Sequence, residues 1–480
     1  MSNKWIVAVD QGTSSCRAFA IDETGKVRAQ KSKVFSPQRP QKGLSFYEAE
    51  QLLSTQLEVL HALLDEIDPH KVAALAVCSQ RSTIVLWDKN TGHSLAPVLT
   101  WEDGRSLRES QIAPISQAEI HAQTGLFKTP YFSAPKITWC LDNCSFAKQA
   151  AQMNTLLAAP VASYLIWHLT KGRVFATDPT LAQRTLLWDI QTGAWSETLC
   201  KVFGVSPSCL PIIQPTVSNY GVYQYKEVSI PICVCVADQQ AAAAYYGLSS
   251  GKTAVNYGTG AFILHHTGNK LSVLPGMLSS VATSYSLTDR QFILEGPIFS
   301  AGSLFDWLKT KGIEVQYDHL DEVVASAKNP VLLLPALGGL GAPYWNYKAH
   351  VAVENITPQT QPADWMAGTL DAIAARVADI IYYLRMNGFS VDSISAAGGL
   401  SRSRYLLQKQ ADVVGVPIHR WPETESSIFG SARLAAGYLT WDLSSWTISP
   451  THEIIPQVSL KKAQEQYKNW QQFVQRKCQL

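Results

Sequence analysis

Apolar residues recur along this chain with two periods, one typical of helices and one typical of strands. The spacing of apolar residues over 47–67 and over 364–387 predicts two amphipathic helices. Short apolar runs between turn residues predict strands at 71–78, 83–87 and 394–397. Strands that alternate with helices in this way predict an α/β fold.

The same patterns place further elements in both halves of the chain. Helices are expected at 148–170 and 403–414, and an amphipathic helix on the surface is expected at 459–477. Apolar runs predict a pair of strands at 230–237 and 253–264. This pair opens the second half of the chain.

The length of the chain, 480 residues, exceeds what one ordinary core accommodates, so two domains of roughly 200–250 residues or three smaller ones are expected. We predict an N-terminal domain at 1–247, a C-terminal domain at 248–445 and a C-terminal surface helix at 446–480. The boundary lies near 245–252, just before the second of two similar turns.

These two turns lie in short segments that resemble each other. Asp10-Gln-Gly-Thr-Ser-Ser follows one apolar run and Asn256-Tyr-Gly-Thr-Gly follows another, and each leads into a second apolar strand. A turn on Gly and Thr exposes backbone N–H groups and hydroxyl groups, which bind phosphate. Two such turns facing each other would hold the phosphates of one nucleotide from both sides. The repeat therefore predicts an ATP site.

Two further glycine-containing segments could bind phosphate. Gly398-Gly399, between a predicted strand and a predicted helix, leaves backbone open to a phosphate or an adenosine ring, although a simple tight turn has the same sequence. Gly247-Leu-Ser-Ser-Gly-Lys-Thr is one residue shorter than the P-loop Gly-x4-Gly-Lys-Thr and leads into a strand rather than a helix. We interpret it as a surface turn with a solvated lysine, and Gly398-Gly399 as the third wall of the nucleotide site.

Polar side chains follow several predicted strands. Asp238 ends the run 230–237 and opens a segment of small residues, so it could cap a helix, accept a proton from a substrate hydroxyl group, or do both. Arg81-Ser82 and Trp101-Glu102 also come after strands. Charged residues at strand ends are often merely solvated, but those at several strand ends of one sheet converge on its ligand crevice.

Composition argues against several classes of protein. The net charge is +2, and no run of Lys and Arg suggests a nucleic-acid partner. No apolar run approaches the roughly 18–20 residues of a membrane span, and the N-terminus reaches Asp10 too soon for a secretory signal. The nine cysteines lack zinc-site spacing, so we expect reduced thiols and a cytoplasmic protein.

The order of short motifs along the chain resembles the FGGY carbohydrate kinase family, and most closely its glycerol kinases. The resemblance runs from the first predicted strand to about residue 440. The motifs that carry it include Asp10-Gln-Gly-Thr-Ser-Ser-Cys-Arg17, Gln80-Arg81, Trp101-Glu-Asp, Tyr131-Phe-Ser-Ala-x-Lys136, Arg184-Thr-Leu-Leu-x-Asp189, Ala237-Asp-Gln-Gln, Tyr257-Gly-Thr-Gly, Glu295-Gly, Ala301-Gly-Ser, Gly338-Gly-Leu-Gly-Ala-Pro-Tyr-Trp and Ala397-Gly-Gly. It implies two actin-like (ribonuclease H-like) domains of the hexokinase, actin and heat-shock ATPase superfamily. ATP, Mg²⁺ and a polyol or sugar would lie in the cleft between the domains.

The resemblance also implies roles for individual residues. Asp238 would be the general base, and Asp10 would organise Mg²⁺ through water. The acceptor pocket would be formed by Arg81, Ser82, Trp101, Tyr131, Asp238, Gln239 and Phe262. The nucleotide would contact Thr13, Ser14, Ser15, Arg17, Thr259, Gly302, Asp306, Gly399 and Ser403.

The chain departs from the glycerol kinases at the acceptor. They have Arg-Glu where this chain has Arg81-Ser82, and the shorter, neutral serine removes a charged hydrogen bond worth roughly 1.5–3 kcal/mol. The pocket also gains volume, which would admit a longer polyol or a ketose. On the nucleotide side, Asp306 and Ser403 replace amide side chains. Glycerol, a longer polyol and a ketose therefore stay open as acceptors, and a homodimer is possible.

Two alternatives belong to other functional classes. A non-catalytic actin-like or sugar-sensing relative would keep the fold, but it would have no physical need for a base beside a polyol pocket. A heat-shock ATPase would need a peptide-binding domain, and we see no segment of suitable length after residue 440. We therefore expect an ATP-dependent kinase that phosphorylates a small polyol or sugar.

Overall fold

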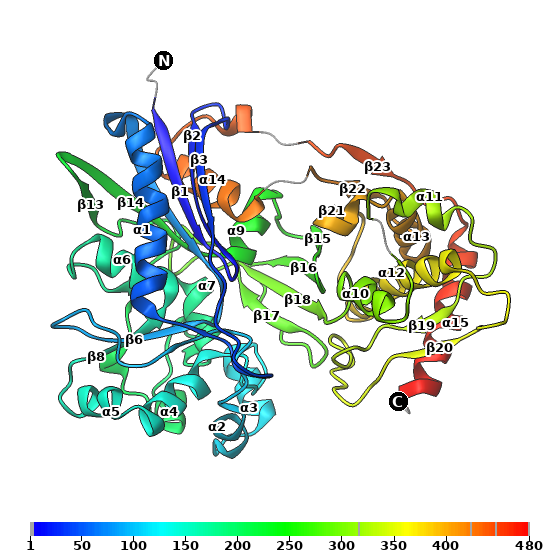
Figure 1. Ribbon diagram of the computed structural model, residues 1–480, viewed down its shortest axis with the longest axis horizontal. Coiled ribbons are helices and arrows are strands. Elements are labelled where there is room, and N and C mark those ends of the chain that lie inside the picture. The colour runs from blue at the N-terminus through cyan, green and yellow to red at the C-terminus, as the bar shows by residue number, and fades with distance from the viewer. Residues whose placement is uncertain (1–3, 315–316, 423–424, 447–448, 479–480) are drawn as a thin grey trace.

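A computed structural model describes residues 4–314, 317–422, 425–446 and 449–478. Two sheets form the frame of the molecule and lie side by side, with helices packed on them (Figure 1). The first sheet contains β1 (Trp5–Gln11), β2 (Ser15–Asp22), β3 (Val27–Val34), β5 (Val72–Ser79), β13 (Val222–Tyr225) and β14 (Val228–Ala237). The second contains β15 (Thr253–Tyr257), β16 (Ala261–Gly268), β17 (Leu278–Val281), β18 (Phe292–Ile298), β21 (Ile394–Ala397), β22 (Ile418–Arg420) and β23 (His452–Ile454).

The two sheets repeat one strand order. In the first, β3-β2-β1 is an antiparallel unit, and β5 and β14 extend it in parallel from β1. In the second, β18-β16-β15 is antiparallel, and β21 and β22 extend it in parallel from β15. β13, β17 and β23 are added at the edges. The duplicated arrangement confirms the predicted pair of actin-like α/β domains.

Both faces of the first sheet are buried. Because successive residues of a strand point to opposite sides of the sheet, each strand contributes to two cores. Val7 and Val9 of β1 join the core that contains α1 (Ala49–Glu66). Ile6 and Ala8 join the core that contains α14 (Ser426–Tyr438). Helix α14 comes from the last part of the chain and still covers the first sheet. The division of the chain at residue 247 stays a prediction.

Most predicted elements are present within a few residues of their expected ends. Helix α1 occupies the segment expected at 47–67, and α12 (Pro362–Met386) the segment expected at 364–387. Strand β21 matches the strand predicted at 394–397. Helices α13 (Arg404–Val414) and α15 (Leu460–Cys478) confirm the helices predicted at 403–414 and 459–477. Further α-helices are α2 (Leu107–Ile112), α3 (Gln117–Thr124), α4 (Ser133–Asn143), α7 (Pro179–Ala182), α8 (Glu197–Phe203), α9 (Asp238–Tyr245), α10 (Ser303–Thr310) and α11 (Leu320–Val324).

The prediction of one helix at 148–170 is wrong. The segment contains the end of α5 (Ser145–Gln152), then β8 (Leu156–Pro160), then α6 (Val161–Leu169). Asn154 has a φ of +55°, which ends the first helix. Every residue of β8 is buried, so this short apolar run has no alternation to mark it as a strand, and periodicity alone cannot separate it from a buried helix.

A small sheet beside the first carries the predicted acceptor residues. Its order is β4 (Phe46–Tyr47), β7 (Val98–Leu99), β6 (Ile84–Asp88) and β8. Arg81 and Ser82 lie in the connection from β5 to β6, and Trp101 follows β7. The Thr83 hydroxyl group accepts from the Trp101 N–H group at 3.2 Å and so joins the two segments. Three two-stranded pairs complete the strands: β9 (Ala176–Thr177) with β12 (Ile212–Ile213), β10 (Trp188–Asp189) with β11 (Ala194–Trp195), and β19 (Leu332–Leu334) with β20 (Ala352–Glu354).

Candidate active site

The first Gly-Thr turn joins β1 to β2. The N–H group of Gly12 closes the turn by donating to the carbonyl oxygen of Ser15 at 3.0 Å. Ser14 is exposed, whereas Thr13 and Ser15 are half-buried. The register of the hairpin places Arg17 opposite Asp10. The residues predicted to hold phosphate and Mg²⁺ therefore lie together at one end of the first sheet.

Two of these predicted phosphate ligands have protein partners. The guanidinium group of Arg17 pairs with the carboxylate of Glu425, directly before α14. The hydroxyl group of Thr13 accepts from Nε1 of Trp101 at 3.0 Å and donates to Oε1 of Gln80 at 3.3 Å. Thr13 thus connects the predicted phosphate turn to the predicted acceptor pocket, and Arg17 would have to exchange a carboxylate for a phosphate.

Asp10 is buried close to the end of β1. Its Oδ2 accepts from the hydroxyl group of Ser427 at 2.7 Å, and Nη1 of Arg17 lies 3.9 Å away. Its Oδ1 is buried and has no hydrogen-bond partner among the described residues. Burial raises the pKa of Asp10 to about 6, with a further contribution from the charge of Asp238. A buried carboxylate oxygen without a partner suits a hard cation such as Mg²⁺.

The second Gly-Thr turn, between β15 and β16, opens on a cavity of about 580 Å³. All five nucleotide contacts predicted in the second half line it: Thr259, Gly302, Asp306, Gly399 and Ser403. A Cβ atom on Gly302 would lie 2.7 Å from the carbonyl oxygen of Gly258, so the two backbone segments touch there. At Gly399 a Cβ atom would meet no atom within 4 Å, so the cavity reaches this backbone directly.

Ser403 lines this cavity, but its hydroxyl group also has a role in the fold. It is the N-cap of α13, accepts from the N–H group of Leu406 at 3.1 Å and donates to Asp321 at 2.6 Å. Asp321 also accepts from the N–H group of Arg404 at 2.7 Å. Sequence reasoning missed Asp321 and the other acidic and aromatic lining residues, Asp318 and Tyr317, because no motif marks the segment that contains them.

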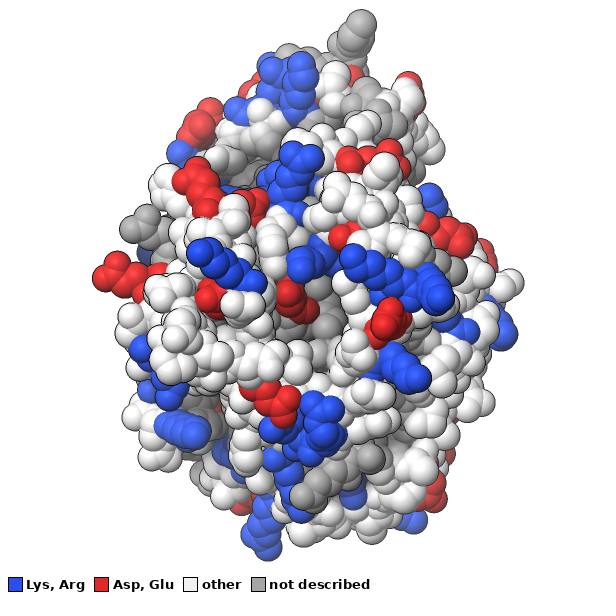
Figure 2. Space-filling model, turned by 90° about the vertical axis from the view of Figure 1, so that its right-hand side faces the viewer, with Lys and Arg blue, Asp and Glu red and all other residues white. Residues whose placement is uncertain are grey.

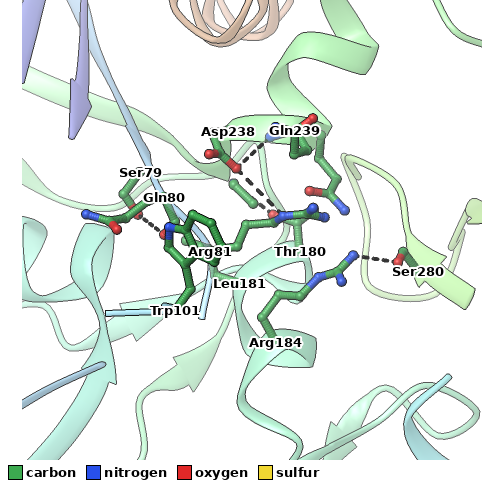
Figure 3. A network of polar contacts seen from close by, with 12 residues as sticks. Ser79, Gln80, Arg81, Trp101, Thr180, Leu181, Arg184, Asp238, Gln239 and Ser280 are labelled. Atoms are coloured by element: carbon green, nitrogen blue, oxygen red, sulfur yellow. Dashed lines mark hydrogen bonds and ion pairs between the residues drawn. The ribbon is translucent and has the colours of Figure 1, made fainter. Parts of the chain in front are cut away.

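Asp238 lies beside Arg81 and interacts electrostatically with Asp10. It is the first residue of α9, and Ala237 occupies the capping position, so the alternative that Asp238 caps the helix is wrong and its possible role as a proton acceptor stays open. Its Oδ1 accepts from the N–H group of Gln239 at 2.7 Å and lies 3.7 Å from Nε of Arg81 (Figure 3). Burial raises the pKa of Asp238, and the positive charge of Arg81 opposes that rise. The side chain is still 29% exposed, so a ligand can reach it from solvent.

Arg81 belongs to a buried network of five side chains. Its Nη1 donates to both carboxylate oxygens of Glu295, at 2.9 and 3.0 Å. Arg184 donates to the same carboxylate and to the hydroxyl group of Ser280 at 2.5 Å, and the two arginines extend in the same direction below Asp238 (Figure 3). Nε2 of Gln240 completes the network at 3.2 Å from Glu295. Burial would raise the pKa of Glu295, but the charges of Arg184 and Arg81 outweigh it and lower that pKa to about 2.

Two aromatic residues form another wall of the predicted acceptor pocket. The rings of Trp101 and Tyr131 have centroids 5.5 Å apart. Lys136 is fully buried beneath them, and its ammonium group donates to the carbonyl oxygens of Pro130, Tyr131 and Phe132 at 2.6, 2.5 and 3.2 Å. Burial lowers the pKa of Lys136 to about 7. This lysine therefore fixes the backbone that presents Tyr131.

The remaining predicted acceptor residues approach from three elements. Ser82 has a φ of +62° and is buried, and its Oγ has no hydrogen-bond partner in the described part of the chain. Gln239 is half-buried on α9. Phe262 lies on β16, two residues from the partner of Glu295 in the register of β16 and β18, so Phe262 and Glu295 share one face of the second sheet.

The P-loop-like segment agrees with its interpretation as a surface turn. Gly247 and Gly251 have positive φ, Lys252 is exposed, and a strand follows, so the segment is a surface turn.

All nine cysteines are free. Among the described residues no group of His, Cys, Asp and Glu could hold a metal ion by itself, and no described helix is long and apolar enough to cross a membrane. On the face shown in Figure 2, basic and acidic side chains are interspersed.

Comparison with models of protein families shows the family to which this chain belongs. The model of the N-terminal domain of the FGGY family of carbohydrate kinases matches residues 5–244, and that of its C-terminal domain matches residues 253–438. The chain belongs to the FGGY family of carbohydrate kinases. This FGGY kinase is therefore an ATP-dependent carbohydrate or polyol kinase that uses Mg²⁺, as the sequence predicts, and no observation supports the non-catalytic alternative.

Known proteins resemble this FGGY kinase over nearly its whole length. The glycerol kinase of Pseudothermotoga lettingae is 33% identical and covers 99% of both chains. The structure of Plasmodium falciparum glycerol kinase with ADP has a TM-score of 0.93 at 26% identity, and covers 99% of this chain and 98% of its own. Ligand-bound xylulose kinase from Lactobacillus acidophilus has a TM-score of 0.85 at 22% identity over 98% of both chains, which shows a common fold alone.

Sequence reasoning named no role for Arg184 or Glu295 of this FGGY kinase, although both stand in motifs that carry the family resemblance. Each lies far from Arg81 along the chain. Only the packing of β18 against the first half brings the three charges together. A buried carboxylate between two arginines has no local signature that a reader of the sequence could use.

Proposed function

We propose that this kinase transfers the γ-phosphate of ATP to a hydroxyl group of a small polyol or ketose, with Asp238 as the general base. One observation carries the proposal. A partly exposed carboxylate with a raised pKa lies 3.7 Å from a buried guanidinium group, close to the indole and phenol rings that would cover a sugar or polyol. Hydroxyl groups are recognised by such a set of charged donors and acceptors.

The residues have complementary tasks in this reaction. Asp238 accepts the proton of the acceptor hydroxyl group as its oxygen attacks the γ-phosphorus. The raised pKa makes this carboxylate a stronger base than an exposed aspartate. Arg81 orients the acceptor and balances the charge of Asp238. Trp101 and Tyr131 cover the acceptor and keep water away from the reacting oxygen.

The residues on the other side of the cleft suit a nucleotide and its metal ion. The cavity beside the second Gly-Thr turn is large enough for a nucleoside, and its glycines leave backbone accessible. Asp10 would hold Mg²⁺ through water at the oxygen that has no partner among the described residues. Bound Mg²⁺ supplies charge neutralisation on the phosphates. Thr13, Ser14, Ser15 and Arg17 would hold the phosphates from the first domain.

Ser82 is the reason to propose an acceptor larger than glycerol. A serine at this position leaves Arg81 without a neighbouring carboxylate on its own loop, and it leaves more room than a glutamate would. The loss of a charged hydrogen bond, roughly 1.5–3 kcal/mol, corresponds to about one to two orders of magnitude in preference. A polyol or ketose with more hydroxyl groups regains contacts that glycerol cannot make.

A coupled assay of ADP release tests both parts of the proposal. The panel contains glycerol, dihydroxyacetone, tetritols, pentitols and ketoses, each with Mg-ATP. We expect strong stimulation by one class of acceptor, with kcat/KM for a longer polyol or a ketose above that for glycerol. A flat response to every acceptor would reject the kinase reaction proposed here. Glycerol as the best acceptor would reject the argument from Ser82 alone.

Two finer properties stay proposals. We propose a cytoplasmic enzyme, because nine free cysteines suit a reducing compartment and ATP is its donor. We also propose a homodimer, and sedimentation velocity of the purified protein over a range of concentrations distinguishes it from a monomer.

A further inference from the structure

Glu295 lies beside the proposed acceptor residues but has no role in the mechanism proposed above. It lies on β18 of the second sheet, fully buried, and its carboxylate accepts hydrogen bonds from Arg81, Arg184 and Gln240. All three donors belong to the first half of the chain, before the second sheet begins. Through this carboxylate, the second sheet contacts the residues of the proposed acceptor site.

The four charged side chains form a balanced set. Arg81 and Arg184 carry two positive charges, and Glu295 and Asp238 carry two negative charges. Glu295 binds both arginines directly, whereas Asp238 lies 3.7 Å from Nε of Arg81. Arg81, Arg184 and Glu295 are almost completely buried, so water screens these charges little. A buried set of charges is stable only when its members are paired.

We propose that Glu295 is a positioning residue for phosphoryl transfer: it holds Arg81 and Arg184 in place from the second sheet and offsets one of their charges beside Asp238. This inference rests on the proposed role of Asp238 as the base. Without the Glu295 carboxylate, both guanidinium charges would act on Asp238. The base would then hold a proton less readily, and Arg81 would lose the partner that fixes its direction.

Other charged groups around Asp238 leave this conclusion intact. Arg81 and Arg184 lower the pKa of Asp238, and Glu295 raises it. The carboxylate of Asp10, on β1, and Asp238 also repel each other. Tyr131, before α4, and Cys78, on β5, face Asp238 as weak acids whose own pKa values are raised by burial, so both are neutral in an assay. Glu425, directly before α14, is paired with Arg17. Glu295 is the carboxylate that binds both arginines.

Contacts of the strand next to β18 also hold this network together, and none of them requires a bound ligand. β17, the neighbour of β18, is tied to the first half by Gln183, which donates to the carbonyl oxygen of Ser279 at 2.6 Å and accepts from the N–H group of Val281 at 3.0 Å. Ser280 between them accepts from Arg184. This edge of the second sheet is thus anchored to the first half, and Glu295 is held in place before the acceptor arrives.

The variant Glu295→Gln tests the charge with little change of shape. With the acceptor found in the panel, we expect kcat/KM to fall at least tenfold and the acidic limb of the kcat/KM profile to move about one unit to lower pH. Glu295 does not titrate in the range of the assay, because its pKa is lowered to about 2 by the two arginines against the effect of burial. A shift of the acidic limb of the kcat/KM profile therefore reflects a change in the pKa of Asp238.

Arg184→Gln provides the opposite test. It removes a positive charge, so the acidic limb should move to higher pH. The double variant Glu295→Gln/Arg184→Gln restores the balance of charge and should return the limb close to its original position, although the rate stays low. A purely structural role would lower the rates and leave the limb of all three variants in place, and that result would overturn the proposal.

A matched control separates these effects from general damage. Asp379 pairs with Arg376 in another buried ion pair, on α12, and Asp379→Asn should lower the melting temperature without moving the acidic limb. If Glu295→Gln does not fold, Glu295→Asp keeps the charge and is expected to keep the position of the limb while losing rate. A limb displaced in Glu295→Asp contradicts the proposal. Failure of the wild-type protein to turn over any acceptor would instead reject the proposed function.

Discussion

The proposed acceptor site and the proposed nucleotide site are built in different ways. On the acceptor side, buried charges bind one another: Arg81 and Arg184 share Glu295, and Asp238 lies beside them. On the nucleotide side, a cavity of about 580 Å³ is lined largely by backbone, glycines and exposed polar side chains. If the two sites are assigned correctly, the acceptor site is organised before binding, whereas the nucleotide site depends mainly on backbone that a ligand can approach closely.

This contrast has an energetic reason. Proton transfer requires a base whose position and pKa are fixed, which buried and mutually paired charges provide. A nucleotide brings its own charges and its own metal ion, so the protein needs mainly accessible N–H groups and space. Substitutions on the acceptor side should therefore affect the rate, and substitutions on the nucleotide side should affect affinity for nucleotide.

The largest expected effect follows from Asp238→Asn. An amide cannot accept the proton, so kcat should fall by about 10³-fold, while the Kd for ADP measured by calorimetry stays within a few-fold of wild type. The same side chain determines the pH dependence. Burial raises its pKa, so wild-type activity should be lost as the pH falls, at a pH above the usual range of an aspartate. A variant that retains a tenth of the wild-type rate would show that another group is the base.

The second expected effect concerns stability. The pKa of Asp10 is raised to about 6 in the folded protein from 3.8, chiefly by burial, so the folded state binds its proton more tightly than the unfolded state does. Stability is then lost as the pH rises from about 4 to about 6. Without Mg²⁺, Asp10→Asn should stabilise the protein at pH 8 by up to about 3 kcal/mol and have little effect at pH 4. Urea denaturation at both pH values measures this, and equal effects at both would contradict the burial argument.

The third expected effect is on the choice of acceptor. Ser82→Glu restores the charged group that the glycerol kinases have, and it should raise the ratio of kcat/KM for glycerol to that for a longer acceptor by about ten- to a hundredfold. Ser82→Ala is the matched control and should leave the ratio nearly unchanged. An unchanged ratio in Ser82→Glu would show that this position does not select the acceptor.

The smallest expected effect distinguishes two glycines of the nucleotide cavity. Gly302→Ala places a Cβ atom 2.7 Å from a carbonyl oxygen, so both the melting temperature and the affinity for ADP should fall. Gly399→Ala meets no protein atom within 4 Å, so it should leave the melting temperature unchanged and weaken ADP binding by about tenfold through contact with the ligand alone. Unchanged ADP affinity in Gly399→Ala would remove this residue from the site.

Local patterns in the sequence predicted the frame of the molecule well. The two Gly-Thr turns, the long helix α12 and strand β21 have strong periodicity or turn residues, so their type and position could be derived. Strand β8 could not, because a short, fully buried run has no period of its own. The resemblance to a family supplied the site residues that no local pattern marks, such as Tyr131 and Phe262.

Long-range contacts set the limit of prediction from sequence. Glu295, Arg184 and Asp321 acquire their environment from segments far away along the chain, and nothing near them in the sequence shows it. The link from Thr13 to Trp101 is of the same kind. Such contacts depend on the packing of complete elements, which composition and spacing do not specify.

Helix α14 has a consequence for how this protein is made. Its residues cover one face of the first sheet, and the backbones of α14 and α9 meet so closely that a Cβ atom on Gly430 would lie 1.8 Å from the carbonyl oxygen of Ala241. A ribosome synthesises the strands of that sheet long before it reaches residue 438. The nascent first half must therefore keep an uncovered apolar face until almost the whole polypeptide has emerged, and chaperones would meet it in that interval.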